Sequence, residues 1–102
     1  MIGVDITDLS RVTEDEAFIR RVLTPEEQLE LAGRKPASRR IEYIGGRFAA
    51  KEALFKATGW NNCLGCSVLN DAYGKPYIKD HPELSVSISH DGGMAIAVVQ
   101  AP

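Results

Sequence analysis

Residues 37–59 have the sequence ASRRIEYIGGRFAAKEALFKATG, the longest stretch of the chain with a helical pattern. Its apolar side chains recur at the 3.6-residue spacing of an α-helix, and Gly59 is suited to end such a helix in a left-handed conformation. The pattern predicts one long helix from Ala37 to Thr58. Its interior pair Gly45-Gly46 costs roughly 1 kcal/mol per residue relative to alanine. We therefore expect another segment to approach closely there, or the helix to bend.

A carboxylate falls inside the apolar stripe of this predicted helix. Four apolar residues share the stripe: Ile41, Ile44, Phe48 and Phe55. Glu52 lies in the middle of them, where partial burial disfavours the charged form unless a cation or hydrogen-bond donors compensate. A divalent cation would do so, since hard cations select oxygen ligands. Periodicity alone supports equally well a surface ion pair between Glu52 and Lys56 on a less buried face.

A second carboxylate, Asp5, lies in the amino-terminal segment. Alternating apolar residues predict a first strand from Met1 to Thr7, and Asp5 interrupts it beside Gly3. Aspartate is disfavoured in strands, so Asp5 needs a specific partner; on its own it would more often be a strand-end acceptor. Asp8 is a rival that suits a turn or cap. Mg²⁺ is usually held by one or two carboxylates plus substrate phosphates, so Asp5 with Glu52 would suit a diphosphate-bearing substrate.

Capping signals predict two short helices before the long one. Thr13, with Glu16 three residues on, predicts a helix that continues through Leu23. The sequence Thr-Pro-Glu-Glu at residues 24–27 predicts a second helix that ends at Gly33.

After residue 67 the pattern changes to strands. The segments SVLND and PYIKD around AYGK predict a hairpin over residues 67–80. Residues 84–90 alternate strictly and end at His90, which is more often a structural residue, although at a strand end it can donate to a phosphate. A tight turn precedes Met94–Gln100, which is apolar on both faces and should be covered by a helix, a sheet or another subunit. One strand, then helices, then antiparallel strands define a single α+β domain over residues 1–102.

Composition excludes several classes of protein. The net charge of −2 gives no sign of a nucleic-acid binder, although Arg20, Arg21, Arg39 and Arg40 could form a local basic patch. The longest apolar stretch, residues 94–99, is too short to span a membrane, and we expect no signal peptide and a cytoplasmic protein. Cys63 and Cys66 form one C-x-x-C with no second pair to complete a zinc site. Two reduced loop thiols are therefore favoured over a redox function.

Taken together, these segments resemble the holo-[acyl-carrier-protein] synthase family. The family's G-x-D with a downstream arginine is matched by Gly3, Asp5 and Arg11. Its highly specific G-R-F-A-A-K-E-A-x-x-K-A helix is matched over residues 46–57. Two shorter elements, G-K-P-Y-I and S-I-S-H, are matched at residues 74–78 and 87–90. The resemblance covers essentially the whole chain.

The resemblance implies a 4′-phosphopantetheinyl transferase-like fold, an antiparallel sheet packed with a long helix, in a homotrimer with active sites between subunits. It implies transfer of 4′-phosphopantetheine from coenzyme A to a serine of apo-acyl carrier protein, which gives holo-carrier protein and adenosine 3′,5′-bisphosphate. Asp5 and Glu52 would bind Mg²⁺ with the diphosphate, and Lys56 would contact the same phosphates or assist the leaving group. The general base stays open between Glu52 and a metal-bound water.

The resemblance also implies further binding residues. Arg47, Lys51 and His90 would hold other parts of coenzyme A, including its 3′-phosphate. Carrier proteins of this kind are acidic, which favours a basic docking surface; its candidates are Arg11, Arg20 and Arg21, with Phe18 as an apolar anchor. Acidic residues at 14–16 argue against strong docking. The alternative function is a non-catalytic oligomeric module that binds coenzyme A or a nucleotide.

Overall fold

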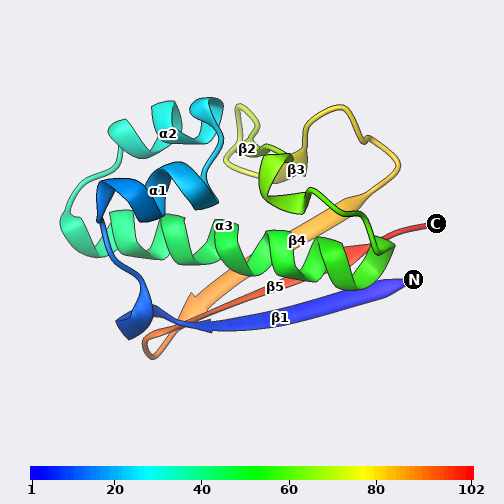
Figure 1. Ribbon diagram of the computed structural model, residues 1–102, viewed down its shortest axis with the longest axis horizontal. Helices are drawn as coiled ribbons and strands as arrows, with labels where there is room; N and C mark the ends of the chain where they lie inside the picture. Colours follow the sequence, from blue (N-terminus) through cyan, green and yellow to red (C-terminus); the bar gives the residue numbers. More distant parts are fainter.

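The structure, a computed structural model, describes residues 1–102. Figure 1 shows the long helix α3 running through the middle of the molecule. In chain order the elements are β1 (Ile2–Asp8), the 3-10 turn η1 (Leu9–Arg11), α1 (Glu16–Val22), α2 (Pro25–Ala32), α3 (Ala37–Thr58), the 3-10 turn η2 (Cys63–Gly65), β2 (Val68–Asn70), β3 (Pro76–Ile78), β4 (Ser85–Asp91) and β5 (Met94–Gln100). The α+β class, the long helix and the hairpin are confirmed.

Helix α3 lies between two layers of the molecule. An antiparallel three-stranded sheet with the order β1-β5-β4 packs against one side of it. Helices α1 and α2 and the β2–β3 hairpin lie along the side away from β1 (Figure 1). Because β5 is central, β1 forms one edge of the sheet, with Val4 opposite Val98. This arrangement places the edge strand that carries Asp5 directly beside α3.

Glycines allow β1 and η1 to approach α3 closely. A Cβ at Gly3 would collide with the backbone carbonyl of Ala53 and would lie 2.7 Å from the amide nitrogen of Ala57. A Cβ at Gly45 would collide with the Leu9 side chain. The close approach predicted at the glycine pair of α3 is therefore confirmed, and the helix is continuous over its 22 residues.

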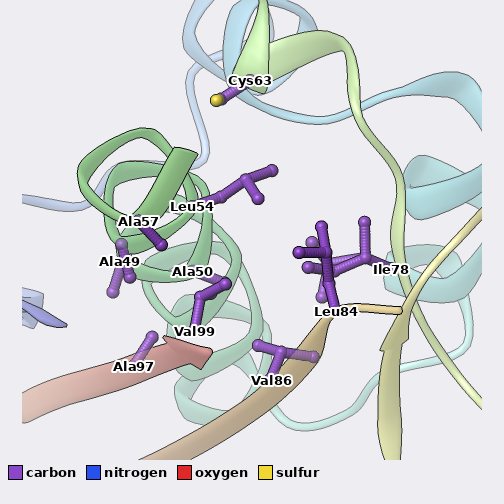
Figure 2. Packing of buried hydrophobic residues seen from close by; sticks show 12 residues of the cluster. Ala49, Ala50, Leu54, Ala57, Cys63, Ile78, Leu84, Val86, Ala97 and Val99 are labelled. Carbon is purple, nitrogen blue, oxygen red and sulfur yellow. The ribbon is translucent and has the colours of Figure 1, made fainter. Parts of the chain in front are cut away.

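The main hydrophobic core fills the space between α3 and the strands (Figure 2). Small side chains of α3, among them Ala49, Ala50 and Ala57, face Ala97 and Val99 from β5 (Figure 2). Alanine on both surfaces permits the close packing of helix on sheet. A second cluster joins α1, α2 and α3 and consists of Val22, Leu23, Leu31, Tyr43 and Ile44.

One of the two predicted helix starts is wrong. The capping box at Thr24 and Glu27 is present as predicted. In α1, however, Asp15 is the N-cap, and its carboxylate accepts a hydrogen bond from the amide of Phe18. The Thr13 hydroxyl accepts from the Asp15 amide at 3.1 Å and so forms a turn that precedes the helix. Both residue types accept well from backbone amides, and the sequence pattern does not distinguish them.

The part of the outer sheet face formed by β1 and β5 is apolar and uncovered within one chain. Five of its side chains are exposed: Ile2, Val4, Ile6, Ile96 and Val98. The opposite face of β5, with Ala95, Ala97 and Val99, is fully buried. The prediction that both faces of β5 are covered is therefore confirmed for the inner face. Within one chain the outer face is uncovered. None of the helices has the length and apolar character needed to cross a membrane.

Candidate active site

Asp5 and Lys56 join β1 to α3. Gly3 faces α3, and since side chains alternate along a strand, Asp5 faces it as well. The ammonium of Lys56 donates to the Asp5 carboxylate at 3.2 Å and to the carbonyl of Val4 at 3.0 Å. The Asp5 side chain is 18% exposed and that of Lys56 is 53% exposed, so both remain open to a ligand.

Glu52 lies one helical turn before Lys56, which places their Cβ atoms about 6 Å apart on the same side of the helix. Its carboxylate takes part in none of the hydrogen bonds or ion pairs of the chain, so the alternative of a Glu52–Lys56 ion pair is wrong. Glu52 borders an open cavity of about 300 Å³ whose far wall is formed by residues 61–64. Asp5, through Lys56, and the unpaired Glu52 thus lie along the same stretch of α3, and the cavity opens beside Glu52.

The apolar stripe around Glu52 is more exposed than its periodicity suggests. Ile44 turns inward and is fully buried, whereas Phe55 is about half exposed. Ile41 and Phe48 are of intermediate exposure. Glu52 therefore lies on a partly open apolar face between the edge strand and the 61–64 segment, where a substrate can reach it.

A separate cavity of about 210 Å³ gathers basic side chains: Arg34, Arg39, Arg47 and His90. His90 lies 3.3 Å from the carboxylate of Glu42 at this cavity. The remaining lining includes Asn70, Gly74 and Pro76 from the β2–β3 hairpin. A concave surface with several cations and few apolar side chains suits a phosphate-bearing ligand.

Arg47 lies at the buried side of this basic cavity and serves the fold as well. It donates to the carbonyl of Val68 at 3.0 Å and to the side chain of Asn70 at 2.8 Å, and its guanidinium lies 4.2 Å from the ring centre of Tyr43. Burial lowers the pKa of Arg47, and the charge of Glu30 opposes that shift. The residue fixes the hairpin to α3 and contributes positive charge to the cavity.

The prediction that Lys51 holds coenzyme A needs correction. Its side chain is fully buried, and its ammonium donates to the carboxylate of Glu27 and to the carbonyls of Val22 and Leu64. An ammonium has three donors, so none is left for a ligand. Burial lowers the pKa of Lys51, an effect that the neighbouring Glu27 carboxylate opposes. Lys51 belongs to the interior of the protein.

The predicted basic patch is divided between different surfaces. Arg20 and Arg21 line a cavity of about 510 Å³ between the end of α1, the start of α2 and residues 62–67. Arg39 lines the basic cavity instead, and Arg40 is paired with Glu14 at 2.6 Å. The four arginines therefore form no single surface.

The other predicted docking residues differ in accessibility. Arg11 is exposed in the turn η1. Phe18 packs partly against the second core cluster, and the guanidinium of Arg21 lies 5.6 Å from its ring centre. Phe18 therefore presents only part of its ring to a partner.

Three other residues singled out in the sequence, Asp8, Cys63 and Cys66, form side-chain hydrogen bonds only with residues close to them in the chain. Asp8 caps η1: its carboxylate accepts from the amide and the hydroxyl of Ser10, and these hydrogen bonds lower its pKa. Cys63 and Cys66 are free thiols in and beside η2, and burial raises the pKa of each. No group of three or more histidine, cysteine or acidic side chains in the chain could hold a metal ion by itself.

Sequence reasoning missed two contributors. Arg34 lies in a connection without regular pattern, so nothing indicated that it would line the basic cavity. Glu27 was identified only as a helix cap, although its carboxylate is also the partner of Lys51. No signal in the sequence distinguishes Glu27 from an exposed capping residue, because its partner Lys51 lies 24 residues away.

The fold and this arrangement define an α+β protein in which Asp5 contacts Lys56, the unpaired Glu52 lies one helical turn away, and a separate cavity gathers basic side chains. A model of the 4′-phosphopantetheinyl transferase superfamily matches residues 1–99. The holo-[acyl-carrier-protein] synthase of Lactococcus lactis subsp. cremoris (strain SK11) is 39% identical over an alignment of 109 positions, gaps included, that covers 95% of this chain and 92% of the relative.

Solved structures agree with that match. A holo-(acyl-carrier-protein) synthase from Bacillus anthracis in complex with CoA (3′,5′-ADP) is 40% identical with a TM-score of 0.84, over 96% of this chain and 91% of that one. The Helicobacter pylori synthase in complex with coenzyme A is 30% identical with a TM-score of 0.82, over 100% of both chains. The chain belongs to the holo-[acyl-carrier-protein] synthase family of the 4′-phosphopantetheinyl transferase superfamily, and it is an enzyme of the transferase class.

Proposed function

We propose that this enzyme moves the 4′-phosphopantetheine group of coenzyme A onto a serine of apo-acyl carrier protein. The observation that carries the proposal is the junction of Asp5 with Lys56, one helical turn from the unpaired Glu52. Two accessible carboxylates and a lysine on adjoining elements suit a phosphoanhydride group, and relatives of this chain have been solved with coenzyme A.

The donor set of this site fits Mg²⁺. Asp5 and Glu52 offer hard oxygen ligands, and Mg²⁺ is usually held by one or two carboxylates plus substrate phosphates and water. The Lys56 ammonium already lies beside Asp5, so this position accommodates a cation. When bound, the ion would neutralise charge on the diphosphate and hold its geometry for in-line displacement.

The residues of the chain then have distinct tasks in the transfer. The serine oxygen of the carrier forms a bond to the β-phosphorus of coenzyme A, and the bond from that phosphorus to the bridging oxygen breaks. Adenosine 3′,5′-bisphosphate leaves, and Lys56 stabilises its developing charge. The serine proton would pass to Glu52 or to a water molecule at the site, the two candidates for the general base. Arg39, Arg47 and His90 in the basic cavity would hold the 3′-phosphate.

The basic cavity includes neither Asp5, Glu52 nor Lys56. We therefore propose that the enzyme is a homotrimer in which the cavity of one subunit meets the acidic pair of the next. The uncovered apolar face formed by β1 and β5 supports this assembly, since monomers rarely leave such a face open. The carrier would dock on Arg11, Arg20 and Arg21, with the exposed part of Phe18 as an apolar contact.

The direct test is mass spectrometry of apo-acyl carrier protein incubated with the enzyme, coenzyme A and Mg²⁺. We expect the carrier to gain one phosphopantetheine group, and no gain when Mg²⁺ is chelated. A folded enzyme with a competent carrier and no gain would contradict the proposal. Calorimetry with coenzyme A then identifies the alternative, a module that binds the nucleotide and transfers nothing.

Glu52→Ala tests the acidic pair. Because the Glu52 carboxylate has no partner in the chain, its removal should abolish transfer while the melting temperature stays unchanged. Glu83→Ala, at an exposed glutamate paired with His81, is the matched control and should transfer normally. Unchanged turnover in Glu52→Ala would show that Glu52 is not part of the active site.

A further inference from the structure

The buried ion pair between Lys51 and Glu27 connects four elements to the helical turn that carries Glu52. We infer that Lys51 is a positioning residue: its ammonium holds the 61–66 segment and the end of α1 in a fixed place relative to Glu52. The inference rests on the proposed function, because it concerns how the reaction site and the docking surface are kept together.

The contacts of the ammonium show what it holds. Lys51 Nζ donates to the carbonyl of Val22 at 2.7 Å, to Glu27 Oε1 at 2.5 Å and to the carbonyl of Leu64 at 2.9 Å. Val22 ends α1 and Leu64 lies within η2, so these carbonyls belong to two segments with no regular hydrogen bonds to α3. The lysine supplies that connection.

The carboxylate of Glu27 extends the connection to two more elements. Its Oε1 accepts from the amide of Thr24 at 2.8 Å, which closes the capping box of α2. Its Oε2 accepts from the amide of Val68 at 2.7 Å, at the start of β2. Both side chains of the pair are 0% exposed. One ion pair therefore fixes α1, α2, η2 and β2 against α3.

The location of η2 explains why its position matters for the reaction. Leu64 lines the cavity that Glu52 borders, and it also lines the cavity of Arg20 and Arg21. The two cavities thus share a wall, and the Lys51 ammonium holds that wall by the Leu64 carbonyl. A shift of the wall would change the distance between the docking arginines and Glu52.

A purely stabilising role accounts poorly for this pair. The cost of removing two charges from water offsets much of their attraction, and well-packed apolar replacements of buried ion pairs are often neutral or stabilising. Directed hydrogen bonds to two backbone carbonyls have no apolar equivalent, because a methyl group cannot donate. Suitable variants can therefore separate a stabilising role of the ion pair from a positioning role.

The first variant is the double substitution Glu27→Leu with Lys51→Met, assayed as the full-length enzyme. We expect a lower melting temperature, because the amides of Thr24 and Val68 lose their acceptor. Measured on the folded enzyme well below that temperature, kcat/KM for apo-carrier protein should fall by about tenfold or more, because small misplacements of reacting groups are costly. KM for coenzyme A should stay the same, since the basic cavity contains neither residue. Lys79→Met, at an exposed lysine paired with Glu26, is the matched control and should change neither value.

The second variant, Glu27→Gln, should lose stability without losing activity. It removes the counter-charge, so the melting temperature should fall, but Lys51 keeps the carbonyls of Val22 and Leu64 and the kinetics of the folded enzyme should be retained. Unchanged carrier kinetics in the double variant would overturn the inference. So would an equal kinetic loss in Glu27→Gln, because the loss would then follow stability.

Hydrogen exchange separates this inference from the proposed function. The amides of Gly65 and Cys66 donate to Asn62 and Cys63 within the wall, and in the double variant they should exchange about tenfold faster or more. This result does not depend on any activity. Unchanged exchange contradicts the positioning role, whereas a failure of the unchanged enzyme to modify the carrier contradicts only the proposed function.

Discussion

Lys56 on α3 reaches across to the edge strand β1, where its ammonium lies 3.2 Å from the carboxylate of Asp5. The same ammonium donates to the Val4 carbonyl at 3.0 Å. The lysine is therefore already placed beside the carboxylate that we assign to the metal, and it is half exposed to solvent. A lysine in this place both supports the transfer and competes with a cation for Asp5.

Lys56→Met separates these two effects. Transfer should fall by about 100-fold, because a charge that stabilises the leaving phosphate is lost. The Mg²⁺ concentration that gives half-maximal rate should fall or stay the same, since the competing ammonium is gone. A Mg²⁺ titration of the transfer assay measures both, with Lys79→Met as the control. A higher Mg²⁺ requirement would show that Lys56 helps to assemble the metal site instead.

Gly3→Ala should be strongly destabilising. The added Cβ would collide with the Ala53 carbonyl, which is backbone and cannot move aside alone. We expect a loss of about 3 kcal/mol in the free energy of unfolding, at the upper end of the usual cost of overpacking. Gly33→Ala is the control, since its φ of −88° suits alanine and its nearest neighbour is 3.6 Å away. Gly33→Ala should raise the free energy of unfolding by about 0.5 kcal/mol. Urea unfolding measures both, and equal midpoints would refute the close contact.

Val98→Lys tests the apolar outer face of the sheet. Val98 lies opposite Val4 in the centre of this face, so a charge there would be buried by a subunit that covers it. We expect a monomer by light scattering after gel filtration, together with a large loss of transfer. Leu29→Lys changes an exposed apolar residue on α2 and should leave the assembly intact. A trimer that persists in Val98→Lys would place the interface elsewhere.

The two thiols should react slowly in the folded protein. Burial raises the pKa of Cys63 and of Cys66 above the ordinary value of 9.0, so the reactive thiolate is scarcer at any given pH. Iodoacetamide should label them at least about tenfold more slowly than a free cysteine at pH 8. Rapid labelling of the native protein at pH 7 would contradict this.

The same pKa shifts predict a pH dependence of stability. A thiol whose pKa is raised by folding contributes stability that is fully present below its unfolded pKa of 9.0 and is lost as the pH rises above that value through the raised folded pKa. Over that pH range the urea midpoint of the unchanged protein should fall, and it should fall by less in the double variant Cys63→Ser with Cys66→Ser. That variant should retain full transfer activity, since neither thiol has a role in the proposed mechanism. Loss of activity would indicate that the two thiols have a function after all.

The sequence predicted the long helix well because its signals are local. Periodicity and the glycine at position 59, which adopts a φ of 74°, depend only on neighbouring residues. The start of α1 was misplaced by two residues because Thr13 and Asp15 are both good caps, and the choice depends on how the turn packs.

The roles of individual side chains were harder to predict, because their partners are distant in the chain. Lysine is among the residue types that are least often buried, so the sequence favoured a solvent-exposed side chain for Lys51. Its partner Glu27 lies 24 residues away on another helix, and no local signal connects the two. The basic cavity is likewise built from several segments, including the connection with Arg34 and the strand with His90. Family motifs identified the residue types, and only the fold shows which of them reach a surface.

The two ends of the chain lie side by side (Figure 1). The Met1 ammonium donates to the Ala101 carbonyl at 2.8 Å, and the Ala101 amide donates to the Met1 carbonyl at 2.8 Å. A short linker could therefore join them, with new ends opened at the exposed turn between β2 and β3. In such a circular permutant, β5 and β1 would form a hairpin instead of pairing across the whole chain. Lower contact order speeds folding, so rearranging the order of the elements would accelerate folding without changing the final architecture.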